Sequence, residues 1–268
     1  MTTRAIAFDL DDTLLRDDRT ISDYTVSVLA ACAARGIRII PASGRARDSM
    51  LGYVRRIGCA DCFLSCNGAE VWDARGALMM QRLLEVSLAR ECARFAQDRD
   101  CYVQCYYGPR FYYSRKCAYA DAYAHSSLLK GEYAGDLTEF IKTPTVKLLL
   151  MDSPERIKAL FEEALELFGG RAAVTCSKPY FMEINPLNAT KGSALAYAGE
   201  RFGFDLSEAV AFGDSLNDLT MLSAAGLGVA MGNAWDDVKE RCGAVCGTNE
   251  QDGVAHYIED HLLREENL

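Results

Sequence analysis

Three aspartates follow a short apolar segment at the start of this chain of 268 residues. Residues 4–8 end in Phe8 and lead directly into Asp9, Asp11 and Asp12. A short apolar run closed by polar residues is typical of a buried strand in a parallel sheet. Ligands bind at the carboxyl ends of such strands, and side chains two apart in an extended segment share a face, so Asp9 and Asp11 would point the same way. A solvated acidic loop would contain the same residues, and the rest of the chain must decide between the two interpretations.

Strands and helices are expected to alternate along much of the chain, which predicts βαβ units. Strands are expected at residues 37–40, 62–66, 209–212 and 228–231, and helices at 23–32, 43–57, 191–202 and 216–225. The pattern changes near residue 83, where aromatic segments of alternating polarity lie between helices. We therefore expect an α/β fold with a Rossmann-like parallel-sheet core formed by residues 1–82 and 187–268. Residues 83–186 would form an inserted α+β cap.

Composition narrows the possible partners. The net charge is −9, and an acidic surface argues against binding to a nucleic-acid polymer or to an anionic membrane, which both need basic patches. No stretch approaches the roughly 18 apolar residues of a membrane span, and the first residues do not form a signal peptide. We therefore expect a cytoplasmic protein, and no pattern indicates its oligomeric state. The 11 cysteines are expected to be reduced thiols, because no fourth ligand completes a zinc site near Cys59, Cys62 and Cys66.

Polar segments in the α/β portion are expected to meet at one edge of the sheet. They are residues 9–12, 43–45, Lys191 and 213–218. Convergence would bring up to four aspartates together, and two charges about 4 Å apart interact by roughly 4 kcal/mol at an effective dielectric of 20. Lys191 can offset one such charge but not four. Oxygen ligands without His or Cys favour Mg²⁺, which binds through one or two carboxylates and a substrate phosphate. The pattern therefore predicts phosphoryl chemistry.

The other side chains in these segments suit that chemistry. The Ser43 hydroxyl and the Gly44 amide, at a predicted strand-to-helix turn, can donate to phosphate oxygens. Lys191 can stabilise developing negative charge. Asp9 can serve as a nucleophile, and Asp11 can protonate a leaving alcohol and later activate water.

Taken together, the motifs resemble those of the haloacid dehalogenase-like hydrolases. They are DLDDTLL from residue 9, Ser43-Gly44-Arg45, Thr190-Lys191-Gly192 and GDSLND from residue 213. Their order and the large insert between the second and third motifs resemble the Cof-type subgroup with a class IIB cap, of which Asn67-Gly68-Ala69 is also typical. The resemblance implies that Asp9 forms an aspartyl-phosphate and that Asp11 is the general acid/base. It also implies that Ser43, Gly44 and Lys191 bind the phosphoryl group.

The same resemblance implies the metal ligands. Mg²⁺ would be bound by Asp9, by Asp11 through its main-chain carbonyl, and by Asp214. Asp218 and Asn217 would support this site, Asp218 among the metal ligands and Asn217 among the residues that bind phosphate. The family usually has Gly at position 12, where this chain has Asp12. We expect the extra carboxylate to face solvent, with a contribution to metal binding as the alternative.

The predicted function is that of a magnesium-dependent phosphatase acting on a small phosphorylated metabolite, such as a sugar phosphate, a nucleotide or a cofactor phosphate. The cap would close over the substrate. A phosphomutase or phosphotransferase could use the same intermediate, and a phosphosugar-binding regulator could lack catalysis, although all four motifs are intact. A signalling receiver domain also groups acids with a lysine, but it has no inserted cap. Arg45 would contact substrate or form a surface or cap-closing salt bridge, and Glu183, Asn185 and Asn188 are candidates to face the site from their position alone.

Overall fold

The core of the molecule is a parallel five-stranded sheet. A computed structural model describes residues 3–264, so residues 1–2 and 265–268 of the predicted core lie outside the described part. The strand order is β14-β13-β12-β1-β2, and each neighbouring pair is parallel. The strands are β1 (Ala5–Phe8), β2 (Arg38–Pro41), β12 (Ala209–Gly213), β13 (Leu227–Ala230) and β14 (Ala244–Val245). The apolar residues of β1 and β12 are fully buried, which explains why these strands read as continuous apolar runs.

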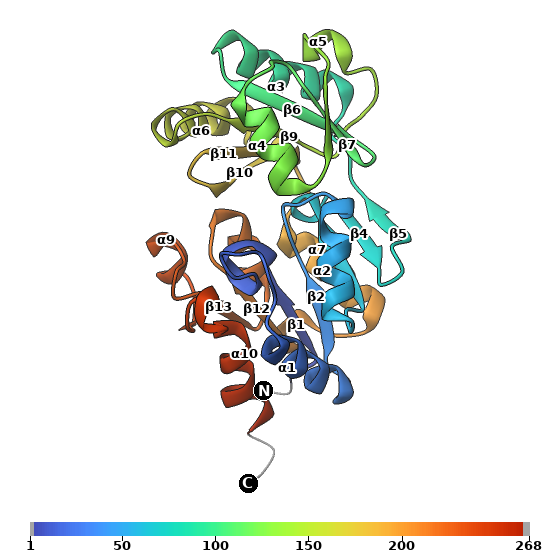
Figure 1. Ribbon diagram of the computed structural model, residues 1–268, viewed down its shortest axis with the longest axis vertical. Coiled ribbons are helices and arrows are strands. Elements are labelled where there is room, and N and C mark those ends of the chain that lie inside the picture. The colour runs from blue at the N-terminus through green and yellow to red at the C-terminus, as the bar shows by residue number, and fades with distance from the viewer. Residues whose placement is uncertain (1–2, 265–268) are drawn as a thin grey trace.

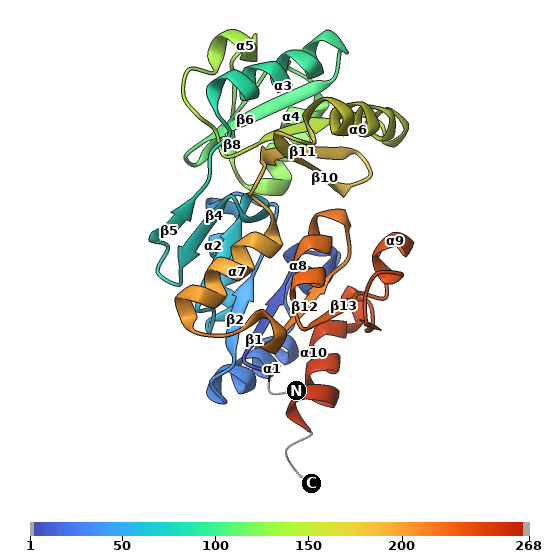
Figure 2. The same ribbon diagram turned by 180° about the vertical axis from the view of Figure 1, so that it is seen from behind.

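Helices cover both faces of this sheet. They are α1 (Asp23–Ala34), α2 (Arg47–Ile57), α7 (Lys191–Phe202), α8 (Leu219–Ala224), α9 (Asp236–Lys239) and α10 (Gly253–Ile258). Helices α7 and α8 pack together on the face toward the viewer in Figure 2, whereas α1 contacts α2 and α10 on the face shown in Figure 1. Ser22 caps α1 by accepting a hydrogen bond from the Thr25 amide, as its position before the apolar run predicts.

A small antiparallel sheet of three strands extends the core beyond β2. It consists of β3 (Cys62–Ser65), β4 (Glu70–Asp73) and β5 (Leu78–Gln81). A single parallel bridge between Ala42 and Leu64 joins β3 to the edge of the main sheet. This small sheet projects beside the core at the level where the chain passes to the second lobe (Figure 1).

The second lobe is a six-stranded sheet in the order β10-β11-β9-β6-β7-β8. Its strands are β6 (Tyr102–Tyr107), β7 (Arg110–Tyr113), β8 (Lys130–Tyr133), β9 (Leu148–Met151), β10 (Ala172–Lys178) and β11 (Phe181–Pro186). All pairs are antiparallel except β7 with β8. Its helices are α3 (Val86–Asp98), α4 (Ala118–Ser127), α5 (Leu137–Phe140) and α6 (Pro154–Phe168). The fold is thus an α/β core with a separate sheet-rich cap, as the sequence predicts.

The cap sheet has two apolar faces. Helices α3 and α6 pack with Val103, Leu148 and Leu150 in one buried cluster. A second cluster joins Tyr106 and Phe111 of the sheet to residues of α4 and to Ala46 and Cys66 of the core. The face that carries α4 therefore lies toward the core, and the aromatic residues of β6 and β7 are largely core packing. Strands β8 and β11 were not predicted from the sequence.

Candidate active site

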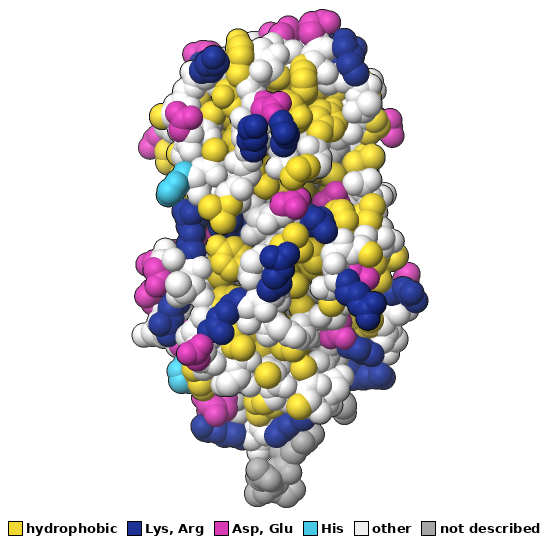
Figure 3. Space-filling model, turned by 45° about the vertical axis from the view of Figure 1, so that its right-hand side comes forward, with side chains coloured by type: hydrophobic (Ala, Val, Ile, Leu, Met, Phe, Trp, Pro, Cys, Tyr) yellow, Lys and Arg dark blue, Asp and Glu magenta, His cyan; other side chains and the backbone are white. Residues whose placement is uncertain are grey.

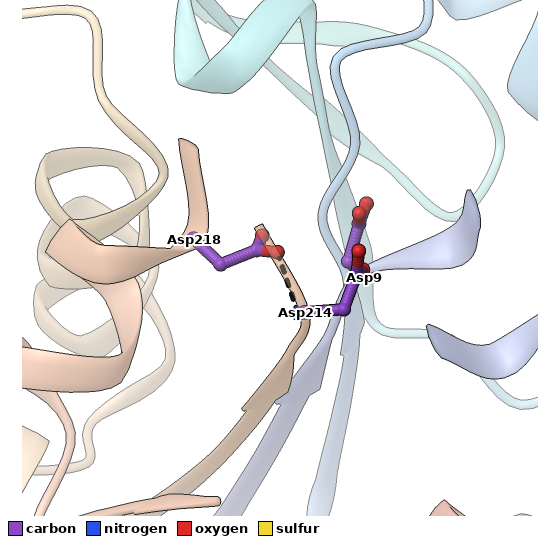
Figure 4. A group of neighbouring side chains, drawn as sticks. All are labelled: Asp9, Asp214 and Asp218. Carbon is purple, nitrogen blue, oxygen red and sulfur yellow. Dashed lines mark hydrogen bonds between the residues drawn. The ribbon is translucent and has the colours of Figure 1, made fainter. Parts of the chain in front are cut away.

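Acidic side chains gather where β1 and β12 end, at the edge of the core sheet that faces the cap. Asp9 directly follows β1 and Asp214 directly follows β12. The two strands are neighbours, with Phe8 opposite Phe212. Their register therefore brings the two aspartates side by side although 205 positions separate them in the chain (214 − 9). Figure 4 shows both carboxylates pointing upward from the strand ends, with Asp218 approaching from the loop after Asp214.

Lys191 is the cation that faces these acids. Its Nζ lies 2.9 Å from Asp9 Oδ1 and 2.5 Å from Asp218 Oδ1, and the side chain is fully buried. Thr190 and Ser193 form a capping box at the start of α7, which fixes Lys191 as the first residue of the helix. Burial opposes the charge of Lys191, but Asp218 and Asp9 outweigh it and raise the pKa of the ammonium.

Asp218 is engaged by the protein on both carboxylate oxygens. While Oδ1 faces Lys191, Oδ2 accepts hydrogen bonds from the main-chain amides of Asp214 and Ser215, at 3.0 and 3.1 Å. The dashed line in Figure 4 marks the bond to Asp214. Gly213 is required beside it, because a Cβ at that position would lie 2.5 Å from the Asp218 Cβ. Asp218 therefore shapes the loop and positions Lys191 in addition to offering a possible ligand atom.

The carboxylates of Asp9, Asp214 and Asp218 form a group that could hold a metal ion. One oxygen from each lies within 4.8 Å of the others, and all three residues are buried. Burial raises the pKa of Asp9 from 3.8 to about 8, with Lys191 acting in the opposite direction. Burial and the neighbouring Asp218 also raise the pKa of Asp214 well above its usual value. Asp9 Oδ1 is buried and receives no well-directed hydrogen bond from the described residues. These carboxylates are buried close together, and ionisation of all three would leave negative charge that Lys191 alone does not neutralise. Mg²⁺ prefers such oxygen ligands and would supply the missing positive charge.

Asp11 takes a different position. Its carboxylate is not part of the three-aspartate group and is held instead by the Arg45 guanidinium, which donates from Nε and Nη2 at 2.7 Å each. Burial opposes ionisation of Asp11, but the charge and hydrogen bonds of Arg45 prevail and lower its pKa. The sequence analysis expects Asp11 to bind the metal through its main-chain carbonyl. Its side chain lies outside the three-aspartate group, which agrees with that expectation.

Three of the four predicted phosphate-binding residues line one cavity with Asp9, whereas Lys191 is fully buried behind Asp9 and is not in the cavity wall. Ser43, Gly44 and Asn217 all contribute to its wall, and its volume is about 210 Å³. The prediction of a helix beginning at Ser43 is wrong, because α2 begins at Arg47 with Ala46 as its cap. A phosphate contact here would therefore use the Ser43 hydroxyl and loop amides, without the N-terminus of a helix.

Asn217 belongs to a chain of buried amides. Its Nδ2 donates to Asn67 Oδ1 at 3.0 Å, and Asn67 Nδ2 donates to Asn185 Oδ1 at 3.2 Å. Asn67 adopts a positive φ of 58°, a backbone conformation that Asn tolerates better than most residues. The chain links the loop after β12 to strand β11 of the cap. Asn185 was expected to face the site, but it is not in the cavity wall and reaches Asn217 only through Asn67.

Several cap residues that reach the cavity were not recognised from the sequence. Lys147, Lys178 and Tyr123 line it together with Glu183. Lys147 is 1% exposed, and its Nζ donates to the Gly44 carbonyl at 2.9 Å. The sequence does indicate Lys147 as unusual, because a single lysine directly precedes the apolar residues of β9. Lys178 and Tyr123 carried no comparable signal.

Asp12 does not simply face solvent. Its carboxylate lies 3.0 Å from Lys178 Nζ of the cap, and both side chains are partly exposed. Its φ is +57°, which fits the family's usual Gly at this position. Asp12 therefore joins core to cap through an ion pair.

Comparison with known proteins identifies the family. A family model for haloacid dehalogenase-like hydrolases matches residues 6–258, and the chain belongs to this family. It is 28% identical to 5-amino-6-(5-phospho-D-ribitylamino)uracil phosphatase YcsE of Bacillus subtilis, over 97% of this chain and 96% of that protein. It is 29% identical to the HMP-PP phosphatase of Serratia proteamaculans, over 97% and 96% of the two chains.

Solved structures share the whole fold. TM0651 from Thermotoga maritima superposes with a TM-score of 0.80 and 32% identity, covering 97% of each chain. The subclass IIB sugar phosphatase BT4131 superposes with a TM-score of 0.85 at 21% identity, covering 96% of this chain and 98% of its own. The chain is thus a Cof-type member with a class IIB cap, and its enzyme class is that of the phosphoric monoester hydrolases.

The surface and the helices add two observations. On the face shown in Figure 3, acidic and basic side chains are interspersed and form no large patch of a single sign. Within residues 3–264, no helix combines the length and apolar character needed to cross a membrane.

Proposed function

We propose that the protein is a magnesium-dependent phosphatase that hydrolyses a small phosphorylated metabolite in the cytoplasm through an aspartyl-phosphate intermediate. One observation carries the proposal. The buried Asp9 carboxylate, 2.9 Å from the Lys191 ammonium, lines the same cavity as Ser43 and Gly44. A nucleophile, a cation and phosphate-binding donors thus meet at one point.

Hydrolysis proceeds in two displacements on phosphorus. An Asp9 oxygen attacks the phosphorus, the ester P–O bond breaks, and the leaving oxygen takes a proton from Asp11, which must first take up a proton because Arg45 lowers its pKa. Asp11, now a carboxylate, then takes a proton from water as the water oxygen attacks the same phosphorus. The bond to Asp9 breaks, and inorganic phosphate is released. Lys191 offsets the negative charge near the phosphoryl group throughout.

Asp9, Asp214 and the main-chain carbonyl of Asp11 would hold Mg²⁺, with Asp218 supporting the site. The ion, when bound, supplies positive charge that screens the nucleophile from the phosphoryl oxygens. The elevated pKa values of Asp9 and Asp214 support this assignment, because a divalent cation would allow both groups to be ionised together.

The substrate is a small ester and not a nucleic-acid polymer. The cavity of about 210 Å³ is below the roughly 300–1,000 Å³ of sites that hold drug-sized ligands. The cap, proposed as residues 83–186, covers it through contacts such as that of Lys147 with Gly44. Two relatives are named for small phosphorylated compounds, a ribitylaminouracil phosphate and HMP-PP, which supports the same substrate size.

Substitution of the nucleophile tests the proposal. We expect Asp9→Asn to abolish phosphate release from p-nitrophenyl phosphate, because a carboxamide cannot form the acyl phosphate. Asp23→Asn is the matched control, since the Asp23 side chain is 98% exposed on α1. Retained turnover in Asp9→Asn would refute the assigned nucleophile.

A further inference from the structure

We infer that Glu183 is a specificity-determining residue that accepts a hydrogen bond from a hydroxyl or amine of the leaving group, so that the substrate is a hydroxylated or amine-bearing phosphate ester. The inference rests on the proposed phosphatase function and concerns the half of the substrate that leaves. It follows from the position, burial and incomplete pairing of Glu183 in the cavity wall.

Glu183 and Lys147 form a buried pair on neighbouring cap strands. Their side chains are 3% and 2% exposed, and Lys147 Nζ lies 3.9 Å from Glu183 Oε1. Glu183 lies in β11 and pairs with Leu149 of β9, while Lys147 directly precedes β9. Charged side chains are rarely buried at such positions unless they are paired or functional.

The pair lies directly over the phosphate-binding loop. Lys147 Nζ donates to the Gly44 carbonyl at 2.9 Å. A Cβ on Gly44 would lie 3.3 Å from Glu183 Oε1, so the carboxylate approaches the backbone closely at this point. Glu183 is therefore within reach of atoms attached to a phosphate that is bound at Ser43 and Gly44.

One carboxylate oxygen of Glu183 has no partner. Oε1 accepts a hydrogen bond from Ser177 Oγ at 2.8 Å. Oε2 is buried and receives no hydrogen bond from the described residues. An unpaired buried carboxylate oxygen is costly. The residue lines the cavity, and rotation of its carboxylate would present this oxygen to a donor on the substrate.

Most cations around the cavity are already engaged by the protein. Arg45 is held by Asp11, and Lys178 is held by Asp12. Lys147 faces the Gly44 carbonyl and Glu183. Arg19 also lines the cavity and donates to the main-chain carbonyl of Ser126, so one cation of the wall has no carboxylate partner among the described residues.

The remaining cap wall suits a compact leaving group with carbon and hydroxyl surfaces. Leu149 and Phe181 provide apolar walls, and Ser177, Tyr123 and Tyr180 add hydroxyl groups. Phe181 and Tyr123 are also in ring contact. A polyol chain or a sugar presents both C–H surface and O–H donors, and it therefore matches this wall.

Two esters of equal carbon count test the inference. Erythritol 4-phosphate carries hydroxyl donors, whereas butyl phosphate carries none. We expect wild-type protein to show a higher kcat/KM for erythritol 4-phosphate. We expect Glu183→Leu to lower that value about 10- to 100-fold, as the loss of one hydrogen bond to a charged group would do. The value for butyl phosphate should change less than about threefold, because butanol offers no donor to Glu183.

Further variants separate recognition from folding. Glu183→Gln keeps the shape of the side chain and an acceptor oxygen. It should therefore lower kcat/KM for erythritol 4-phosphate less than Glu183→Leu does. The double variant Lys147→Met with Glu183→Leu leaves no unpaired buried charge, and it should also lose the preference for the polyol ester. Glu132→Gln is the matched control, because Glu132 is a cap carboxylate that pairs with Arg110 and lies outside the cavity wall. Thermal unfolding of each variant verifies that it is folded.

The outcomes distinguish the two levels of the proposal. If wild-type protein hydrolyses p-nitrophenyl phosphate but has equal kcat/KM for erythritol 4-phosphate and butyl phosphate, the role of Glu183 is refuted and the phosphatase function stands. The same conclusion holds if the Glu183 variants lower kcat/KM equally for both esters. If wild-type protein releases phosphate from none of the three esters with Mg²⁺ present, the proposed function itself fails.

Discussion

The guanidinium of Arg45 donates two hydrogen bonds of 2.7 Å to the carboxylate of Asp11. The third nitrogen of Arg45 donates to the main-chain carbonyl of Ser126, at the end of cap helix α4, at 3.3 Å. Ser49 also donates to the neighbouring carbonyl of Ser127. Arg45 therefore links the proposed acid/base directly to the cap. A movement of α4 that displaces this guanidinium would also change the pKa of Asp11.

Removal of this guanidinium should change how Asp11 titrates. Burial opposes ionisation of Asp11, and Arg45 is the main group that lowers its pKa. We expect Arg45→Met to raise the pKa of Asp11. We also expect it to lower kcat about tenfold, because Asp11 loses the two hydrogen bonds that fix its position for proton transfer. The measurement is kcat against pH, in which the limb due to Asp11 should move to higher pH.

Two variants control this prediction. Arg45→Lys retains a charge without the two-pronged geometry, so its limb should move less. Arg38→Met removes an arginine that pairs with Asp61 at 2.7 Å on the core surface, and its profile should match the wild type. An unchanged pH profile in Arg45→Met would contradict the coupling, even if kcat falls.

The buried Asp9 should make stability depend on pH and on Mg²⁺. Burial raises the pKa of Asp9 to about 8, so the folded protein holds this proton more tightly than the unfolded chain. Without metal, the free energy of unfolding should therefore fall as pH rises from about 4 to about 8. Mg²⁺ binds the ionised carboxylates, so its addition should raise Tm more at about pH 8 than at about pH 6.

Thermal unfolding in EDTA and in excess Mg²⁺ at both pH values measures this effect. Asp214→Asn removes one carboxylate of the proposed site and should reduce the Mg²⁺-dependent rise in Tm. A rise of equal size at both pH values would count against the proposed ligands. Phosphate release should also stop in EDTA and return with Mg²⁺, with Zn²⁺ less effective.

Two glycines form a matched pair for packing around Lys191. A Cβ on Gly192 would lie 2.2 Å from the carbonyl oxygen of Thr220, so Gly192→Ala forces α7 away from α8. We expect it to lower the free energy of unfolding by about 1–3 kcal/mol, as overpacking does, and to lower kcat because Lys191 moves. Gly52 is exposed within α2 and has nothing within 4 Å of its Cβ position. Gly52→Ala should instead raise the free energy of unfolding by about 0.5–1 kcal/mol.

Urea unfolding measures both glycine variants under one condition. Equal stability of the two would contradict the close approach of α7 to α8. A loss of stability without any loss of kcat in Gly192→Ala would show that Lys191 keeps its position despite the displaced helix.

Local patterns predicted the core elements well. The apolar run before Asp9, the cap residue Ser22 and the helix from Lys191 to Phe202 each follow from short-range chemistry, and the structure contains them. Parallel strands present their carboxyl ends at one edge, and this rule predicted that Asp9 and Asp214 would meet. Buried strands and capped helices are therefore the part of this fold that one sequence specifies most directly.

Contacts between core and cap could not be predicted in the same way. The pairing of Asp12 with Lys178 spans 166 positions (178 − 12), and no local pattern specifies it. The expected start of α2 at Ser43 is wrong because residues 43–45 bend against the loop after β3. The Ser43 amide donates to the Leu64 carbonyl, and the Cys66 amide donates to the Arg45 carbonyl. Tertiary contacts decided these positions.

The ion pair between Asp12 and Lys178 gives the last prediction. Both side chains are partly exposed, so the pair is worth at most about 1 kcal/mol and is screened by salt. We expect Asp12→Asn, which keeps a residue tolerant of positive φ, to raise KM up to about fivefold at low ionic strength. Because the pair joins core to cap, the difference from wild type should vanish in about 0.5 M NaCl. Lys178→Met should behave in the same way, and the double variant should be no worse than either single variant. A KM difference that persists at high salt would instead indicate that Asp12 acts through the metal site, and measuring Mg²⁺ affinity of Asp12→Asn would then decide the matter.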